Sequence, residues 1–197
     1  MSKLSTLGAC AAIPALLLQT GSTFAEELSY DYIEGAYVST TIDGNGFGDI
    51  DGDGFAFGGS ARIADNYHLF GSFQSLDYDS NLDFSALEIG AGYMVPVGTG
   101  TDLVARLSYI NGEVDTPFGD ADDSGFGIAV GFRQIFLPQL QGAAFVRHVD
   151  LDESGGDTSL KLEGEYFFNP EFSAGLSLEF SDDATSWGLG ARLYFGK

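Results

Sequence analysis

Regular alternation of bulky apolar residues with small residues constrains this chain more than any other feature. The segment 124–136 reads SGFGIAVGFRQIF, with Phe, Ile or Val at every second position and mostly Gly and Ala between them. The segment 186–195, SWGLGARLYF, repeats the pattern. Side chains point to opposite faces along an extended strand, so a two-residue period predicts β-strands with one strongly apolar face.

The same pattern predicts an all-β chain of ten strands. Transmembrane strands need ~9–11 residues when tilted, and the alternating segments suit that length. Eight strands remain an alternative, because the first and seventh segments alternate poorly. The expected strands lie near 30–42, 55–63, 67–76, 85–95, 101–111, 124–136, 140–150, 157–168, 172–181 and 186–195.

The connections between these segments are of two kinds. Short turns with Pro, Gly or Asn follow every second strand, at 64–66, 95–100, 137–139 and 169–171. The other connections are acidic and contain no Lys or Arg; they lie near 43–54, 77–84, 112–123, 150–157 and 182–186. Short turns at one end and longer loops at the other are typical of an antiparallel up-and-down transmembrane β-barrel.

The second face of the strands distinguishes a membrane barrel from a secreted β domain, which is the alternative fold. That face carries Gly, Ala and Ser with single charged residues, whereas a water-exposed strand face is normally rich in Lys, Thr, Asn and Gln. Charged residues can pair inside a narrow barrel while the other face meets lipid. We therefore expect Arg62, Arg106, Arg133 and Arg192 to face the lumen and pair with strand-borne glutamates. The full set of expected lumen charges is Glu34, Arg62, Glu88, Arg106, Arg133, Lys161, Glu163, Glu179 and Arg192.

The N-terminus has the features of an export signal. Residues 1–25 contain Lys3, an apolar run over 7–18 and a small-x-small exit before Glu26. This predicts a signal peptide at 1–25 and a barrel domain at 26–197. Cys10 leaves a lipoprotein signal as a weaker alternative, and cleavage after Ala25 would leave a domain without cysteine.

The charge of the chain excludes one class of partner. Its net charge is −21, from 8 Lys and Arg against 29 Asp and Glu. Nucleic-acid binding needs cationic side chains for the phosphates, so we expect none.

Six stretches resemble a known family: YDYIEGAYV, HLFGSF, LEIGAGYMVPV, TDLVARLSY, FNPEFSAGLSLEF and WGLGARLYF. They are similar to the small porin-like outer-membrane β-barrel family, in particular its short vesicle-associated members. The resemblance implies a barrel in the outer membrane of a Gram-negative bacterium and carries over no active-site residue. Family members usually end on an aromatic residue that the assembly machinery reads, whereas here Gly196 and Lys197 follow Phe195.

The stretch GDIDGDGFAF (48–57) has the spacing of a calcium loop. Asp49, Asp51 and Asp53 occupy positions one, three and five, and Gly54 occupies the turn position. Position twelve, which should be a bidentate Glu, is Ser60. We expect a surface-loop turn and no cofactor, with weak calcium binding by the three aspartates as an open alternative.

Catalytic motifs are weak in this chain. Asp77 and Asp79 together with His148 and Asp150 lie at strand ends, as the acidic and histidine pairs do in omptin-type outer-membrane proteases, but the His-x-Asp order differs. We expect no enzyme, and a structural or surface-interaction role with acidic outer loops. The alternatives are a small cation-preferring channel and, more remotely, a hydrolase at the rim. The expected partners are outer-membrane lipid, lipopolysaccharide and the β-barrel assembly machinery, with the external partner unknown.

Overall fold

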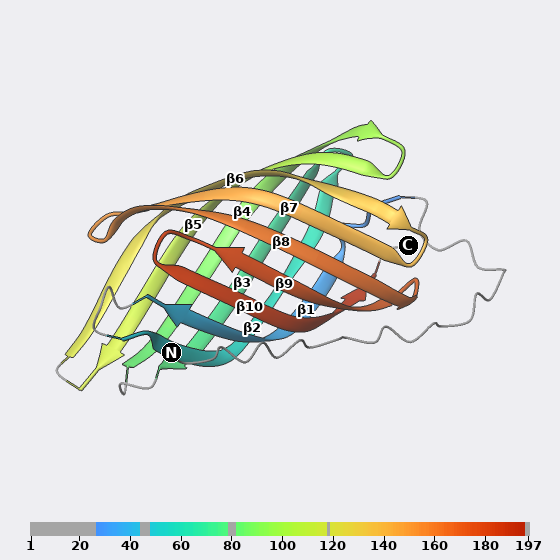
Figure 1. Ribbon diagram of the computed structural model, residues 1–197. Helices are drawn as coiled ribbons and strands as arrows, with labels where there is room; N and C mark the ends of the chain where they lie inside the picture. The colour runs from blue at the N-terminus through green and yellow to red at the C-terminus, as the bar shows by residue number, and fades with distance from the viewer. Residues whose placement is uncertain (1–26, 44–47, 79–81, 118, 196–197) are drawn as a thin grey trace, which may run out of the picture.

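Ten antiparallel strands close into a barrel in a computed structural model, which describes residues 27–43, 48–78, 82–117 and 119–195 (Figure 1). Each strand pairs with its neighbours in the sequence, and β1 pairs with β10 to close the barrel. The ten-strand expectation is confirmed and the eight-strand alternative is wrong. The strands are β1 (Tyr32–Ile42), β2 (Ile50–Ala64), β3 (Tyr67–Tyr78), β4 (Leu82–Gly98), β5 (Thr101–Thr116), β6 (Gly119–Leu137), β7 (Leu140–Leu151), β8 (Gly155–Asn169), β9 (Phe172–Phe180) and β10 (Ala184–Tyr194).

Three expected strand boundaries were wrong at the acidic end. β2 begins at Ile50, so Asp51 and Asp53 belong to a strand and not to a loop turn. β5 ends only at Thr116 and β6 begins already at Gly119, so most of the acidic stretch 112–123 forms a long hairpin. The expected signal peptide at 1–25 lies outside the described residues.

The outward face of the barrel is apolar. Exposed residues such as Phe57, Leu107, Phe126 and Leu189 are 58–63% accessible and alternate with residues that face inward. Aromatic pairs lie on this face, including Tyr67 with Tyr93, whose ring centroids are 5.0 Å apart. An apolar outer surface on a closed barrel is what contact with lipid requires. Among the described residues, no helix is long and apolar enough to cross a membrane.

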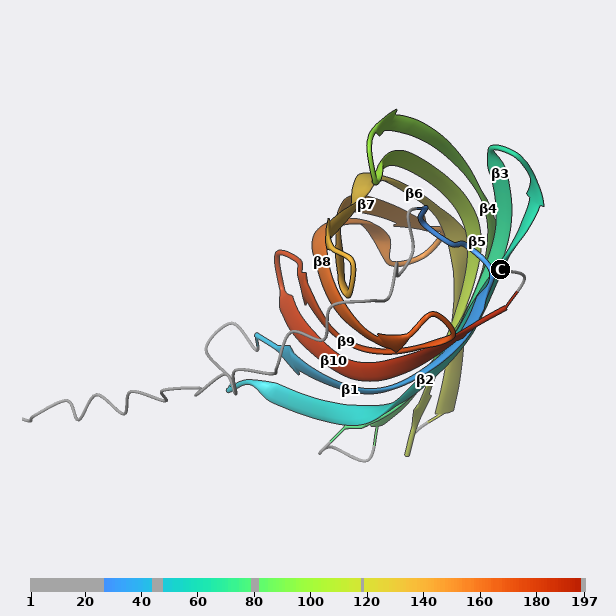
Figure 2. The ribbon, with the colours of Figure 1, turned by 90° about the vertical axis from the view of Figure 1, so that its right-hand side faces the viewer.

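The two ends of the barrel differ. We call the end that carries the short β2–β3, β4–β5, β6–β7 and β8–β9 connections the turn end, and the opposite end the loop end. Figure 2 looks at the turn end, where the blue segment before β1 lies across the opening of the barrel. At the other end, the β5–β6 hairpin projects at the lower left of Figure 1.

Rings from one strand fill the space beside glycines of the next, so the interior is packed near the turn end. A Cβ at Gly92 of β4 would lie 2.1 Å from Cε1 of His68 on β3, and one at Gly131 of β6 would lie 2.5 Å from Cδ1 of Phe145 on β7. Both distances are shorter than any real Cβ contact, so only glycine admits these rings. Alternating small and large residues in this way fill a narrow barrel.

Candidate functional site

Charged side chains converge on Arg192 in the interior. Its guanidinium donates from Nε to Glu34 on β1 at 2.6 Å, and from Nη1 and Nη2 to Glu165 and Glu163 on β8 at 3.0 and 3.2 Å. The Arg192 side chain is 16% exposed, and its ring contact is Tyr32, at 4.8 Å from Cζ to the centroid. We call Arg192, Glu34, Glu163 and Glu165 the arginine hub. It joins β10 to β1 and β8, so it spans the seam where the barrel closes.

Further ion pairs flank the hub on the loop-end side. Lys161 Nζ lies 3.5 Å from Glu163, and Arg147 of β7 lies 3.1 Å from Glu88 of β4. Glu179 accepts a hydrogen bond from Ser159 at 2.7 Å. Strands far apart in the sequence are therefore linked through the lumen.

Three arginines near the turn end have other partners than expected. Arg62 pairs with Glu27, which precedes the strands, at 3.4 Å. Among the described residues, neither Arg106 nor Arg133 has an ion pair. Arg106 instead lies over the rings of Phe70 and Phe145, at 5.2 and 4.8 Å. The expected pairing of all four arginines with strand-borne glutamates is thus wrong for these three. Rings contact Arg106, whereas backbone oxygens accept from Arg62 and Arg133.

A short segment before β1 supplies those oxygens. We call residues 27–31 the plug. Arg133 donates to the carbonyl oxygen of Ser29 at 2.9 Å, and its Cζ lies 4.7 Å from the centroid of the Tyr30 ring. Tyr30 has no exposed surface and donates its hydroxyl to Asp102 at 2.9 Å.

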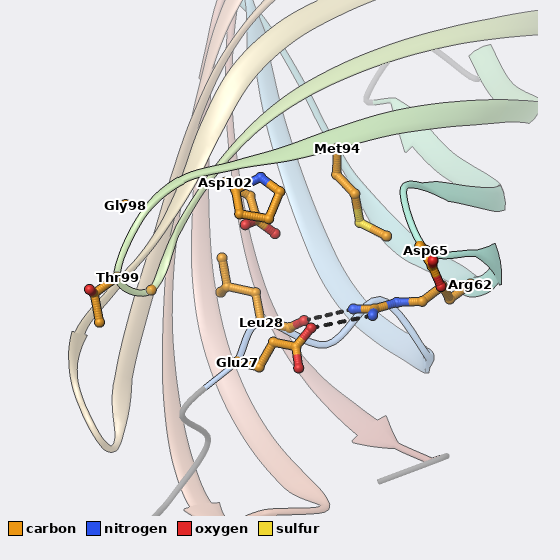
Figure 3. Close-up of a pocket in the computed structure, with 10 residues that line it drawn as sticks. Glu27, Leu28, Arg62, Asp65, Met94, Gly98, Thr99 and Asp102 are labelled. Atoms are coloured by element: carbon orange, nitrogen blue, oxygen red, sulfur yellow. Dashed lines mark hydrogen bonds and ion pairs between the residues drawn. The ribbon is translucent and has the colours of Figure 1, made fainter.

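The plug is fastened at both ends and packed at its centre. Arg62 donates to the carbonyl oxygen of Leu28 at 3.2 Å, and the amide of Phe195 donates to the carbonyl oxygen of Asp31 at 3.0 Å. Figure 3 shows the Arg62 contacts with Glu27 and Leu28. The plug side chains complete an apolar cluster inside the turn end, made of Leu28, Tyr30, Met94, Val104, Ala143 and Phe145.

Two cavities adjoin the plug and the hub. One of about 310 Å³ opens beside the plug and is drawn in Figure 3. It is lined by Arg62, by the carboxylates of Glu27, Asp65 and Asp102, and by the apolar Met94. A second, of about 10 Å³, lies within the hub and holds at most one water.

Carboxylates gather on the outward face at the loop end. The strand registers place Asp53 opposite Asp77, Asp77 opposite Asp83, Asp83 opposite Asp115, and Asp115 opposite Asp120. We call these five residues the carboxylate row; it runs across β2 to β6. Loss of hydration, followed by the charge of Asp120 and a hydrogen bond to it, raises the pKa of Asp115 above its ordinary value.

The three aspartates of the expected calcium loop are placed as follows. Asp49 precedes β2, and Asp51 and Asp53 follow within it on the outward face. Thr41 of β1 donates to Asp51 at 2.7 Å. Within the described part of the chain, no three His, Cys, Asp or Glu side chains come together as a metal site.

The residues of the remote hydrolase alternative lie on separate strands. Asp77 is on β3, whereas His148 and Asp150 are on β7, and all three face outward. His148 shares a 2.9 Å hydrogen bond with Thr158 of β8. Because β4, β5 and β6 separate β3 from β7, the barrel wall keeps Asp77 away from His148. Asp79 lies outside the described residues.

Comparison with known proteins supports the fold. No protein-family model and no curated protein matches the sequence. The chain is similar to the β domain of the Bordetella autotransporter BrkA, with TM-score 0.54 and 11% identity over 84% of this chain and 99% of that one. It also resembles a KdgM porin (TM-score 0.44, 13% identity, 83% and 99% covered) and Ail of Yersinia pestis (0.41, 16%, 85% and 100%). The chain thus shares its closed β-barrel fold with the BrkA domain, and the barrel architecture that the sequence resemblance implied is confirmed.

Sequence reasoning missed several interior residues. Glu165 and Arg147 lie on strands with inward parity, so alternation alone could have added them to the lumen set. Tyr30 and Asp102 had no such signal, because their contact depends on the path of the plug.

Proposed function

We propose that this protein is a non-conducting outer-membrane barrel whose acidic loop end acts as an interaction surface. The observation that carries this proposal is the double closure of the lumen. The plug places the buried Tyr30 ring in the turn end. Next to it the arginine hub extends into the lumen from β1, β8 and β10, and the ion pair of Arg147 on β7 with Glu88 on β4 crosses the lumen beyond the hub. A solute would have to displace both layers.

The charge distribution supports the same proposal. A selective channel needs an uncompensated field along its path, whereas the inward-facing strand charges nearly balance. The cations are Arg106, Arg133, Arg147, Lys161 and Arg192, and the carboxylates are Glu34, Glu88, Glu163, Glu165 and Glu179. The uncompensated charge lies on the outward face, in the carboxylate row. Such a surface attracts cations and repels anions, so it suits a cationic partner.

We propose that two zones of the outer surface, the apolar band and the carboxylate row, meet different surroundings. The apolar band meets outer-membrane lipid, and the protein reaches it through the β-barrel assembly machinery. The carboxylate row lies beyond the band, where lipopolysaccharide phosphates are also anionic. Divalent cations would have to lie between the two sets of charges, and weak calcium binding near Asp51 and Asp53 would serve this purpose.

We infer no catalytic role for the rim. The separation of Asp77 from His148 and Asp150 supports this, because a general base must lie within hydrogen-bond reach of its partner group.

The test combines location with conductance. The protein is expected in the outer-membrane fraction, with a different electrophoretic mobility before and after heating. In planar bilayers the same preparation should give no steady conductance steps. Recovery from the soluble periplasmic fraction would contradict the location, and reproducible cation-selective steps would replace the surface role with the channel alternative.

A further inference from the structure

The edge of β6 extends beyond its neighbour at the loop end. β6 pairs with β5 over its whole acidic part, from Gly119 opposite Thr116 to Ser124 opposite Asn111. Its pairing with β7 begins only at Gly125, opposite Leu151. In the described residues, no strand continues β7 alongside residues 119–123, which we call the free edge.

Two hydrogen bonds show which backbone groups face outward from this edge. The hydroxyl of Thr116 on β5 donates to the carbonyl oxygen of Gly119 at 2.7 Å, so the backbone carbonyl of residue 119 points toward β5. The amide of Asp152, just after β7, donates to the carbonyl oxygen of Ser124 at 2.9 Å, so residue 124 faces the β7 side. Backbone groups alternate along an antiparallel strand. The N–H and C=O groups of Asp120 and Asp122 therefore face the free edge.

The chain after β7 turns away and is held there. Asp123 accepts hydrogen bonds from the amides of Glu153 and Ser154, at 3.1 and 2.8 Å. This fastens the β7–β8 loop at the base of the free edge, and residues 119–122 above it are exposed. An unpaired strand edge of this kind is a template for another strand.

The charges beside the edge select the occupant. Asp120 and Asp122 lie on the outward face, and their cross-strand neighbours on β5 are Asp115 and Glu113. A second copy of this chain would place carboxylates against carboxylates, which disfavours pairing of two such edges. A strand with Lys or Arg at alternate positions would place its cations beside them.

We propose that the free edge of β6 binds an extended, cationic peptide segment of a partner protein by strand addition. The proposal rests on the proposed function of the loop end as an interaction surface, and it names the partner's chemistry. Five residues of strand span about 17 Å, so the partner needs about five extended residues. Backbone hydrogen bonds would supply the register, and the carboxylates would supply the preference for cations.

The test uses the full-chain barrel in detergent and two synthetic probes. The first is a capped seven-residue peptide of alternating Lys and Thr. The second probe is a pair of peptides with the same sequence and charge. One carries N-methyl groups on its odd-numbered amides and the other on its even-numbered amides, and these are its two phases. Binding is measured by fluorescence anisotropy of the labelled peptides, and protection of the Asp120 and Asp122 amides by hydrogen exchange.

Matched variants separate charge from backbone. D122N removes the charge and keeps the N–H, while D122P removes both, and proline is tolerated where an N–H faces outward from a sheet edge. Retention of the heat-dependent mobility shift shows that each variant is folded. D122P is expected to weaken peptide binding by about tenfold more than D122N, which corresponds to the loss of one backbone hydrogen bond. One phase of the N-methylated peptide should show a similar loss on the wild-type protein.

Each opposite result overturns the proposal. Equal affinities of D122N and D122P, or of the parent peptide and both N-methylated peptides, would mean that charge alone holds the peptide. No binding at low salt would exclude the cationic strand, and concentration-dependent dimers without peptide would make a second copy the occupant. Conductance steps would contradict the proposed function and leave these binding results unaffected, so the two failures are distinguishable.

Discussion

Arg192 shows how a single residue can tie the barrel together. It lies one residue before the outward-facing Leu193 and two before the buried Tyr194, near the end of the last strand. Its three carboxylate partners come from the first and the eighth strands. Buried ion pairs add little over apolar packing when they form, but removing one partner leaves buried charges without compensation.

Replacing this arginine should therefore be costly. R192L would leave Glu34, Glu163 and Glu165 facing one another and is expected to lower the free energy of unfolding by about 3–5 kcal/mol. Urea titration of the folded barrel in detergent, followed by tryptophan fluorescence, measures this. R147L is the matched control, because Arg147 has one partner and its side chain is 27% exposed. A loss no larger than that of R147L would show that the hub is well hydrated.

At the scale of strands, alternation predicted the faces and the number of strands, but charge obscured their ends. Asp51 and Asp53, and likewise Asp120 and Asp122, keep the outward parity of the strands that follow them. A Gly- and Asp-rich composition normally indicates turns, so the sequence alone predicts loops at these positions. Tertiary pairing with β1 and β5 overrides that local preference. The partners of Arg133 could not be predicted, because the plug lies far from it in the sequence. Those of Arg106 could not be predicted either, because the rings of Phe70 and Phe145 come from β3 and β7, which are not its neighbours in the sheet.

The carboxylate row gives a prediction for the loop-end hairpins. Asp83 has Asp77 on one side and Asp115 on the other, and like charges directly opposite destabilise a sheet. D83N is expected to raise the unfolding temperature by about 1–3 °C at low salt. D182N, outside the row at the same end, is the control for the change in net charge. The gain should shrink with added salt or calcium; a gain that persists at high salt would contradict the electrostatic explanation.

Asp123 and Asp115 should respond oppositely to acid. A hydrogen bond from the Ser154 side chain and others from the amides of Glu153 and Ser154 lower the pKa of Asp123 below its ordinary value of 3.8. Its stabilisation of the β7–β8 loop is thus fully present above pH 3.8 and lost as the pH falls further, through the folded-state value. Because the pKa of Asp115 is raised, its carboxylate takes up a proton at a higher pH than the ordinary value of 3.8. As the pH falls, this protonation relieves the repulsion between carboxylates in the β5–β6 hairpin.

Hydrogen exchange of individual amides over a pH series measures both effects. After correction for the intrinsic rates, protection of the Glu153 and Ser154 amides should persist at pH 4 and decrease at lower pH. The hairpin amides should gain protection between pH 7 and pH 4. D123N should remove the first effect and leave the second; loss of loop protection already at pH 5 in the wild type would contradict the assignment of Asp123.

The whole molecule combines a compensated interior with an acidic exterior at one end. The plug and the hub occupy successive levels of the lumen, and each rests on contacts that the other does not share: Tyr30 on Asp102 and Arg133, and Arg192 on Glu34, Glu163 and Glu165. We expect either layer alone to block the passage of solutes.

Removing the two closures separately and together tests this arrangement. Deletion of residues 27–31 opens the turn end but leaves the hub, and R192G opens the hub but leaves Tyr30 in the turn end. Both single variants should remain silent in planar bilayers, whereas the combined variant should give steady conductance steps. Heat-dependent mobility of all three proteins is the control for barrel formation. Steps from either single variant would mean that the remaining layer does not seal the lumen, and a silent but folded double variant would mean that the side chains above the hub close it as well.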